Sequence, residues 1–219
     1  MMSTISVTSP ASSIGLLTIP QARIATGVET GRDTELTMLV EEISAEIASL
    51  CNVRGDGTNP PTLLRETVTE TWRPGTECMS LPTRLYLSRR PVKTGLTVTE
   101  GGATLTENTD YRLEPVLGAI DRIVASQPIP WSWWAGFATD YTIVAVYEAG
   151  LVSVEPELRA AAMELARLRW TDKSRDPGLR AERVDGVGSV EYWVRAAAEQ
   201  SVPASVLDRL ARYRTWGVG

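Results

Sequence analysis

Apolar residues recur at helical spacing most clearly in residues 154–170. Leu158, Ala162, Leu165 and Leu168 follow one another at steps of three and four, so they share one face of a helix. A proline near the start of this segment is tolerated in a first helical turn, because its missing N–H would have had no intrahelical partner. The pattern predicts a long amphipathic helix around which the rest of the chain is organised.

Three further helices are predicted. A long one begins at Asp33 or Thr34 and runs to about Leu50, where a dense cluster of glycine, asparagine and proline follows. We expect it to pack on the helix of residues 154–170, because it too has one apolar face. A short helix is predicted between Thr18 and Gly27, and a last one begins at Pro203. The apolar face of the last helix consists of Val206, Leu207 and Leu210.

The periodicity changes from helical to alternating between residues 62 and 150. Short apolar segments recur there at nearly regular spacing with turn signals between them, and Gly101-Gly102 is one such turn. Strands are predicted at residues 64–72, 85–87, 92–99, 111–113, 119–123 and 141–147. This pattern predicts a small antiparallel β-sandwich or barrel-like module.

The order of elements predicts an α+β fold: a small helical bundle, an inserted antiparallel β-sandwich or barrel-like module, and an extended C-terminal tail. Residues 1–13 are rich in serine and threonine and are expected to form a flexible N-terminal arm. Residues 14–61 and 151–219 would form the helical core with its C-terminal interaction tail, and residues 62–150 the inserted β module. Residues 187–193 look like a strand with no obvious local partner.

Composition narrows the function classes. The chain has 219 residues, a net charge of −5 and no histidine, which removes the commonest general base and metal ligand. Cys51 and Cys78 cannot form a zinc site alone, and two reduced thiols are the simplest expectation. The acidic balance argues against nucleic-acid binding by charge alone. Neither a signal peptide nor a membrane span is expected, so we expect no membrane partner.

The search for catalytic chemistry finds no candidate catalytic, cofactor-binding or metal-binding residues. Gly186-Val187-Gly188 begins like a dinucleotide-binding loop, but Glu191 stands where the third glycine would be, so a turn is favoured. Carboxylates are plentiful, yet their spacing singles out no acid/base pair. We therefore expect no enzymatic activity and no cofactor, although a hydrolase that uses carboxylates alone stays an alternative.

Aromatic residues form two unusual clusters. Trp131, Trp133 and Trp134 follow two prolines, and their rings could close one end of the β core or contact another protein. An aromatic platform for a carbohydrate or another ligand is the alternative function. Near the C-terminus, Tyr213 and Trp216 have little helix left to cover them, so we expect them to dock on a partner or neighbour.

The order and spacing of several segments resemble the head–tail connector, or adaptor, proteins of tailed phages and of phage-like gene transfer agents. The resemblance covers roughly residues 16–213. The segments that carry it are Leu85-Tyr86-Leu87-Ser88-Arg89-Arg90-Pro91-Val92, Gly101-Gly102, Asp110-Tyr111-Arg112-Leu113, Gly118-Ala119-Ile120, Tyr147-Glu148-Ala149-Gly150, Val154-Glu155-Pro156-Glu157-Leu158-Arg159-Ala160-Ala161, Gly188-Ser189-Val190-Glu191-Tyr192 and Val202-Pro203.

The resemblance implies a structural protein of the virion neck, made in the bacterial cytoplasm. Such head completion proteins form a ring, usually a dodecamer of self-associated copies, below the portal protein of a filled head. They extend the DNA channel and dock the next tail-completion or stopper protein. DNA would pass without sequence-specific binding, and twelve copies at −5 would give the ring a charge of −60.

Candidate interface residues follow from the resemblance and from the apparent lack of a local partner for residues 187–193. A strand with no partner in its own chain is what strand addition between subunits would need. The candidates in the late strand and the C-terminal segment are Val187, Val190, Tyr192, Trp193, Tyr213 and Trp216. Trp131, Trp133 and Trp134 are the candidates in the tryptophan cluster.

Overall fold

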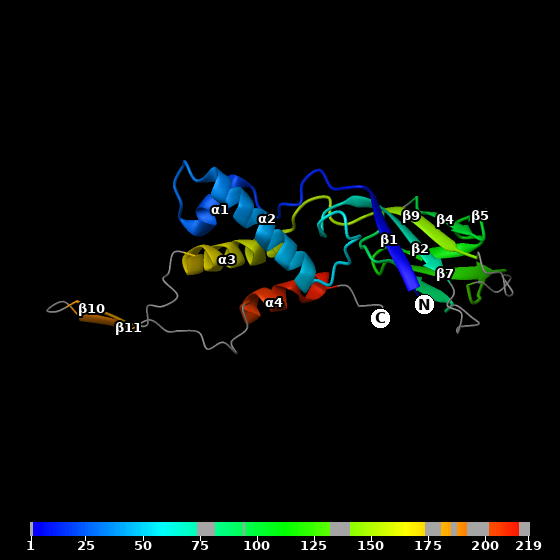
Figure 1. Cartoon of the computed structure of the whole chain (residues 1–219). Helices are drawn as coiled ribbons and strands as arrows, with labels where there is room; N and C mark the ends of the chain where they lie inside the picture. Colours follow the sequence, from blue (N-terminus) through cyan, green and yellow to red (C-terminus); the bar gives the residue numbers. More distant parts are fainter. Residues whose placement is uncertain are drawn as a thin grey trace. The chain divides into compact units, whose positions relative to one another are not determined.

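The structure is a computed structural model that describes residues 2–73, 82–93, 95–131, 141–173, 181–184, 188–191 and 202–214. The described residues form helices and antiparallel sheets, which confirms the α+β prediction (Figure 1). The chain divides into two compact units. The sheet unit comprises Met1–Ile14, Ala45–Val154 and Tyr213–Gly219, and the helical unit comprises Gly15–Ser44 and Glu155–Arg212.

Two antiparallel sheets build the sheet unit. The five-stranded sheet has the order β1 (Met2–Ser9), β2 (Glu66–Arg73), β9 (Ile143–Ala149), β4 (Thr97–Glu100) and β5 (Ala103–Leu105). The other has the order β3 (Arg84–Tyr86), β7 (Ala119–Val124) and β6 (Tyr111–Glu114), with β8 (Gln127–Pro128) paired to β7. Neither sheet closes into a barrel, so the sandwich form of the prediction is the one observed.

The core of this unit is built by alternation along the strands. In β2, Glu66, Val68, Glu70 and Trp72 are buried while the residues between them are partly exposed. Both sheets contribute to one continuous apolar core. Its buried members are Val68, Trp72, Leu85, Leu87, Val92, Leu96, Val98, Tyr111, Leu113, Ile120, Trp131, Ile143, Ala145, Tyr147 and Ala149.

The N-terminal residues do not form the flexible arm that the sequence predicts. Residues 2–9 form β1, which pairs antiparallel with β2 along nearly its whole length. The serines and threonines that suggested a loose segment alternate with Ile5 and Val7, which are partly buried. The alternation of partly buried Ile5 and Val7 with exposed Thr4, Ser6 and Thr8 therefore fits a strand at the edge of a sheet.

One strand is shorter than predicted. Of residues 92–99, only those from Thr97 onward belong to β4, and Val92 makes a single isolated bridge to Ala149. Gly150, just after that bridge, has a φ of +103°. A Cβ atom at Gly150 would lie 2.4 Å from the carbonyl oxygen of Leu64, so the close approach of the two backbones requires glycine here.

Helices α1 (Ile19–Thr26), α3 (Pro156–Lys173) and α4 (Ala204–Leu210) belong to the helical unit. Helix α2 (Asp33–Leu50) begins in this unit, and its last residues from Ala45 count with the sheet unit. All four correspond to predicted helices. At the start of α1 the Gln21 side chain accepts the Thr18 N–H at 2.9 Å, and Gly27 ends this helix in the left-handed conformation.

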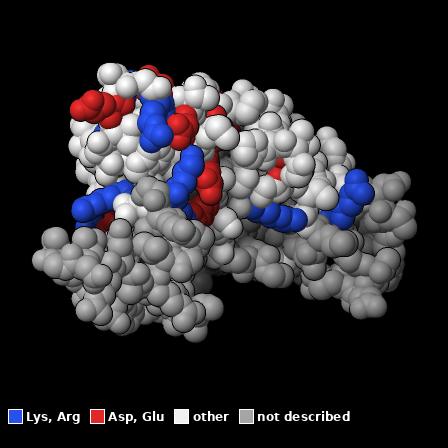
Figure 2. Space-filling view, turned by 60° about the vertical axis from the view of Figure 1, so that its left-hand side comes forward, with Lys and Arg blue, Asp and Glu red and all other residues white. Residues whose placement is uncertain are grey.

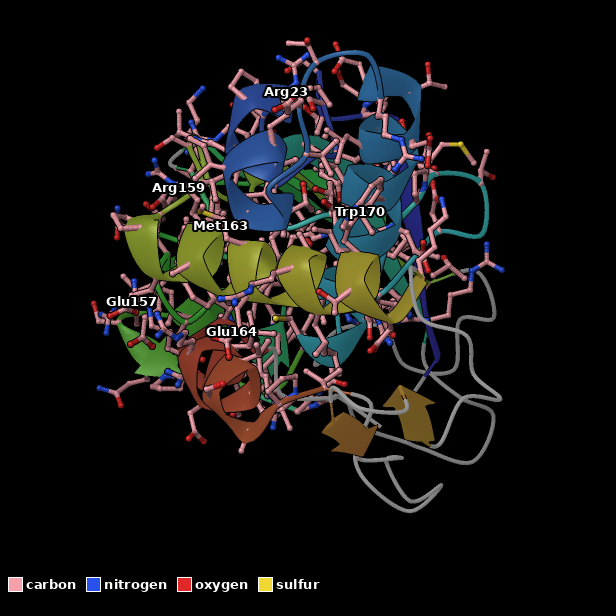
Figure 3. All side chains as sticks on the ribbon, turned by 90° about the vertical axis from the view of Figure 1, so that its left-hand side faces the viewer. Arg23, Glu157, Arg159, Met163, Glu164 and Trp170 are labelled. Atoms are coloured by element: carbon pink, nitrogen blue, oxygen red, sulfur yellow. The ribbon has the colours of Figure 1, made fainter. Side chains whose placement is uncertain are left out.

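Helix α3 is the centre of the helical unit. Its five fully buried residues are Leu158, Ala161, Ala162, Leu165 and Ala166. Helices α1 and α4 lie along opposite sides of α3 (Figure 3). The contact of α2 with α3 is less extensive than that of α1 or α4, so the two long helices are not the main packed pair that the sequence predicts.

Helix α4 packs on α3 instead of extending away as part of a tail. Val206 and Leu210 are fully buried, as predicted, while Leu207 is only partly buried. A short 3₁₀ helix, η1 (Ala211–Tyr213), continues α4. The Arg212 guanidinium makes ion pairs with Glu155 and with Glu157 at the start of α3. The C-terminal segment up to residue 214 is therefore part of the folded molecule.

Buried charged groups interrupt the apolar core of the sheet unit, Glu66, Glu70 and Arg89 among them. Arg89 Nε donates to Glu66 Oε1 at 2.6 Å, and both side chains are almost fully buried. Glu70 accepts the Ser88 N–H and hydroxyl at 3.0 and 2.6 Å, and the Tyr147 hydroxyl at 3.0 Å. Burial raises the pKa of both carboxyl groups, and these hydrogen bonds oppose the shift.

Replacing Leu210 by Ala tests whether α4 is docked. The change removes a fully buried side chain, so we expect the free energy of unfolding to fall by about 2–5 kcal/mol. Chemical denaturation followed by far-UV circular dichroism measures it. Arg209→Ala, at an exposed position of the same helix, is the matched control and should change little. Equal stability of the two variants would mean that α4 does not pack on α3.

Replacing Glu70 by Gln tests the buried carboxyl group. Its pKa in the folded state is raised above the ordinary value of 4.5, so the folded protein takes up a proton at a higher pH than the unfolded chain. The stability difference, wild type minus Glu70→Gln, should therefore increase as the pH falls from above the raised pKa toward 4.5. Its slope is at most about 1.4 kcal/mol per pH unit for one proton. Any fixed cost of altered hydrogen bonds does not change this slope, whereas a pH-independent difference would contradict the raised pKa.

Candidate assembly interface

The most distinctive candidate surface is a β-hairpin between α3 and α4. Its strands are β10 (Ala181–Val184) and β11 (Gly188–Glu191), which pair antiparallel from Ala181–Glu191 to Val184–Gly188. The late strand predicted from residues 187–193 therefore has a local partner, contrary to the sequence analysis. The missed signal is Asp185-Gly186, a dipeptide common in hairpin turns, which falls in the three-residue stretch of sequence between the two paired strands.

This hairpin forms a sheet of its own within the described part of the chain. Each strand contributes four paired residues, and an isolated two-stranded hairpin is at best marginally stable in water. Each strand also keeps one edge on which its backbone pairs with no other described strand. The hairpin is therefore suited to be stabilised by another protein surface, through edge pairing or through its faces.

Contacts with the start of α2 hold the C-terminal end of α3, from which the segment that contains the hairpin continues. Near the end of α3, the Arg32 guanidinium and the Lys173 ammonium each lie 5.6 Å from the ring centre of Trp170. Glu35 pairs with both cations, at 3.4 Å to Arg32 and 3.2 Å to Lys173. These contacts tie the start of α2 to the last turn of α3, where Trp170 lies in Figure 3. The segment that leads to the hairpin therefore begins at a helix end that is held in place.

At the other end of α3, the return of the chain is fixed by α4. The Ser205 hydroxyl donates to Glu164, which lies on the α4 side of α3 in Figure 3. Arg212 pairs with the first-turn Glu157 at 2.7 Å. The end of α3 and the helix α4 are therefore both held in place by contacts within the helical unit. The hairpin belongs to the segment of chain that connects them.

Charges on the helical unit are mixed. The face seen in Figure 2 carries basic and acidic side chains next to one another over the described residues, without a single-sign patch. Several charged residues of the helical unit are paired, among them Arg23 with Asp33 and Arg212 with Glu155. A surface that grips phosphates needs a concentration of unpaired Lys and Arg, so this face does not have the charge pattern of a nucleic-acid-binding site.

Trp131 has a structural role in the sheet unit. It is fully buried in the core between the sheets, and its backbone N–H donates to the carbonyl of Pro82 at 3.3 Å. The interpretation that its ring closes the β core is confirmed, and Trp131 does not present a platform for a ligand. Trp133 and Trp134 lie outside the described residues.

The remaining candidate interface residues divide between described and undescribed segments. Val190 lies in β11, and Tyr213 ends the 3₁₀ helix with its side chain partly buried. The structure thus places one candidate in the hairpin and one after α4. Val187, Tyr192, Trp193 and Trp216 lie outside the described residues.

The described residues contain no evident catalytic or metal centre. Glu66 and Glu70 lie four residues apart on β2, so their Cα atoms are roughly 13 Å apart, and each carboxylate is held by different partners. Burial raises the pKa of the Cys51 thiol to about 11, which leaves it protonated and unreactive at neutral pH. In the described segments, no three cysteine or carboxylate side chains gather as metal ligands. No described helix is long and apolar enough to cross a membrane.

Comparison with known proteins gives a likeness in structure alone. No family model matches the chain, and no curated protein matches it in sequence. A solved structure described as "Virion of native gene transfer agent (GTA) particle" contains a chain with a similar fold, at a TM-score of 0.54 and 16% identity. The likeness covers 98% of this chain and 96% of that chain. The two chains therefore share a fold over nearly their whole lengths, including both units described above.

Proposed function

We propose that this protein is a structural component of a tailed phage or phage-like gene transfer agent particle, and specifically its head–tail adaptor. The observation that carries the proposal is the shared fold with a chain of the gene transfer agent virion, which covers 98% of one chain and 96% of the other. A match of this extent includes the helices, the sheets and their order. A chance likeness of one common supersecondary motif would cover far less of each chain.

In this role the copies form a ring, a dodecamer in the proposal, below the portal protein of a filled head. The ring extends the DNA channel on one side of the portal, and the next tail-completion or stopper protein docks on its other end. The anchored helices α1, α3 and α4 supply a rigid body. The β10–β11 hairpin is the part that engages the portal or a neighbouring copy, because its short strands gain stability from an external surface.

The charge of the chain supports passage of DNA without specific binding. A net charge of −5 per copy makes the whole ring acidic, and the face of the helical unit in Figure 2 has no cluster of one sign. Screening limits the range of any surface charge to about 8 Å at physiological salt. Carboxylates that line the channel would therefore keep DNA from adhering, while charges elsewhere on the ring would have no effect on it.

Deleting the gene from the phage or prophage that carries it tests the proposal. We expect heads that are filled with DNA but carry no tail, because the adaptor joins two structures that assemble separately. Electron microscopy of the particles from induced cultures measures the proportion of joined heads and tails. A plasmid copy of the wild-type gene should restore joining. Normal tailed particles without the gene would contradict the adaptor role.

Complementation with two variants tests the proposed role of the hairpin. In the first, residues 181–191 are replaced by a glycine–serine segment of equal length, which should leave folding intact but should not restore tailed particles. In the matched control, Val116→Asp adds a charge at an exposed loop position, 82% exposed, and should restore them. Circular dichroism melting of both purified proteins confirms folding. Full restoration by the hairpin variant would show that the hairpin does not make the contact.

A further inference from the structure

Strand β1 lies at an edge of the five-stranded sheet. Among the described strands it pairs with β2 alone, so no described strand pairs with the other edge of its backbone. In an antiparallel pair the backbone groups of successive residues point alternately toward the partner strand and away from it. The Val7 N–H points away from β2, because it bonds to the Asp56 side chain. The backbone groups of Ser3 and Ile5 therefore point to the same outer edge.

Two charged side chains from the turn after α2 bind this outer edge. The Arg54 guanidinium donates to the Ser3 carbonyl and to the Ser3 hydroxyl, each at 2.5 Å. Asp56 Oδ2 accepts the Val7 N–H at 3.0 Å. One side chain thus satisfies an outward acceptor and the other an outward donor, four residues apart along the strand. We call Arg54 and Asp56 the edge clip.

The Asp56 carboxylate is held in place by its own turn. It accepts the backbone N–H groups of Asn59 and Thr58 at 2.7 and 2.9 Å, and the Asn59 side-chain amide at 2.9 Å. These hydrogen bonds, the largest contribution coming from the Asn59 backbone, hold the pKa of Asp56 well below its usual range. The carboxylate is therefore oriented and charged before it meets β1, as a fixed acceptor should be.

We propose that the edge clip closes β1 against strand addition by a second copy of this chain. A second copy is the relevant partner because it presents the same eight-residue edge strand, so two β1 strands related by a two-fold axis could pair along their whole lengths. Open edge strands of this kind are a recognised hazard for aggregation. The clip occupies two of the backbone positions that such pairing needs. This inference does not depend on the proposed adaptor function.

The test is the association state of the purified full-length protein. In the double variant Arg54→Ala/Asp56→Ala, we expect the weight-average mass from sedimentation equilibrium to rise at lower protein concentrations than in the wild type. The matched control is Lys93→Ala/Glu148→Ala, which removes an exposed 2.7 Å ion pair in the same unit without touching the β1 edge. It should associate as the wild type does. Wild-type behaviour of a folded double clip variant would overturn the proposal.

A third substitution identifies the surface used in the association. Ile5→Pro removes an N–H that points to the outer edge and is not needed by the β1–β2 ladder, and a proline blocks strand addition at an edge. Added to the double clip variant, it should return the association to the wild-type level. If association persists with Ile5→Pro in a protein that keeps its circular dichroism spectrum, another surface is responsible and the proposal fails.

Hydrogen exchange distinguishes two roles of the edge clip. The clip could block the outer edge of β1, or it could keep β1 paired with β2. In Asp56→Ala, which leaves Arg54 in place, the Val7 amide should exchange faster, while the inward amides of Thr4 and Ser6 should keep their wild-type rates. This measurement remains decisive if the double variant is unstable. Faster exchange of Thr4 and Ser6 as well would mean that the clip holds β1 on the sheet, and would overturn the guarding role.

Discussion

The burial of one face of α3 is the constraint on which the helical unit depends. Leu158 and Leu165 are fully buried together with three alanines, and the small side chains let α1 and α4 approach the helix closely. Burying these residues supplies the apolar contact that the short α1 and α4 would lack as isolated helices. The ion pairs of Arg212 with Glu155 and Glu157 orient α4 on α3, because they hold the end of α4 at the first turn of α3.

The two units place different demands on their polar groups. In the sheet unit, Glu66 and Glu70 point into the core, and each is hydrogen-bonded to a specific partner. Because only one arrangement of the core satisfies these hydrogen bonds, they help to specify a single packing. In the helical unit the charged groups lie at the surface and pair across helices. The β10–β11 hairpin pairs with no other described strand, and this makes it the natural candidate for a contact completed by another molecule.

The sequence predicts those parts of the fold that depend on local pattern. The helical periodicity of Leu158 and Leu165 and the alternation around Val68 are recognisable within a few residues of sequence, and the structure confirms both.

The N-terminal strand was missed because its serines and threonines suggested disorder, although Ile5 and Val7 alternate with them. The β10 partner of the late strand was missed because the Asp185-Gly186 turn signal was given too little weight. Distant partners lie 18 to 77 residues away in the sequence, so no local pattern could identify them: Arg89 for Glu66, Ser88 and Tyr147 for Glu70, and Val7 for Asp56. Residues of the candidate interface could be named from a family resemblance, but the sequence left open whether Trp131 lies in the β core, where the structure places it, or contacts another protein.

In the proposed adaptor role, copies of this protein form a connecting ring in the neck of a particle and are bound by other proteins on several sides. Cryo-electron microscopy of the particles encoded beside this gene tests it most directly. We expect density for a ring of this fold between the portal and the tail, with the β10–β11 hairpin in contact with the portal or a neighbouring copy. A reconstruction of intact particles in which another fold fills that position, or in which this one is absent, would contradict it.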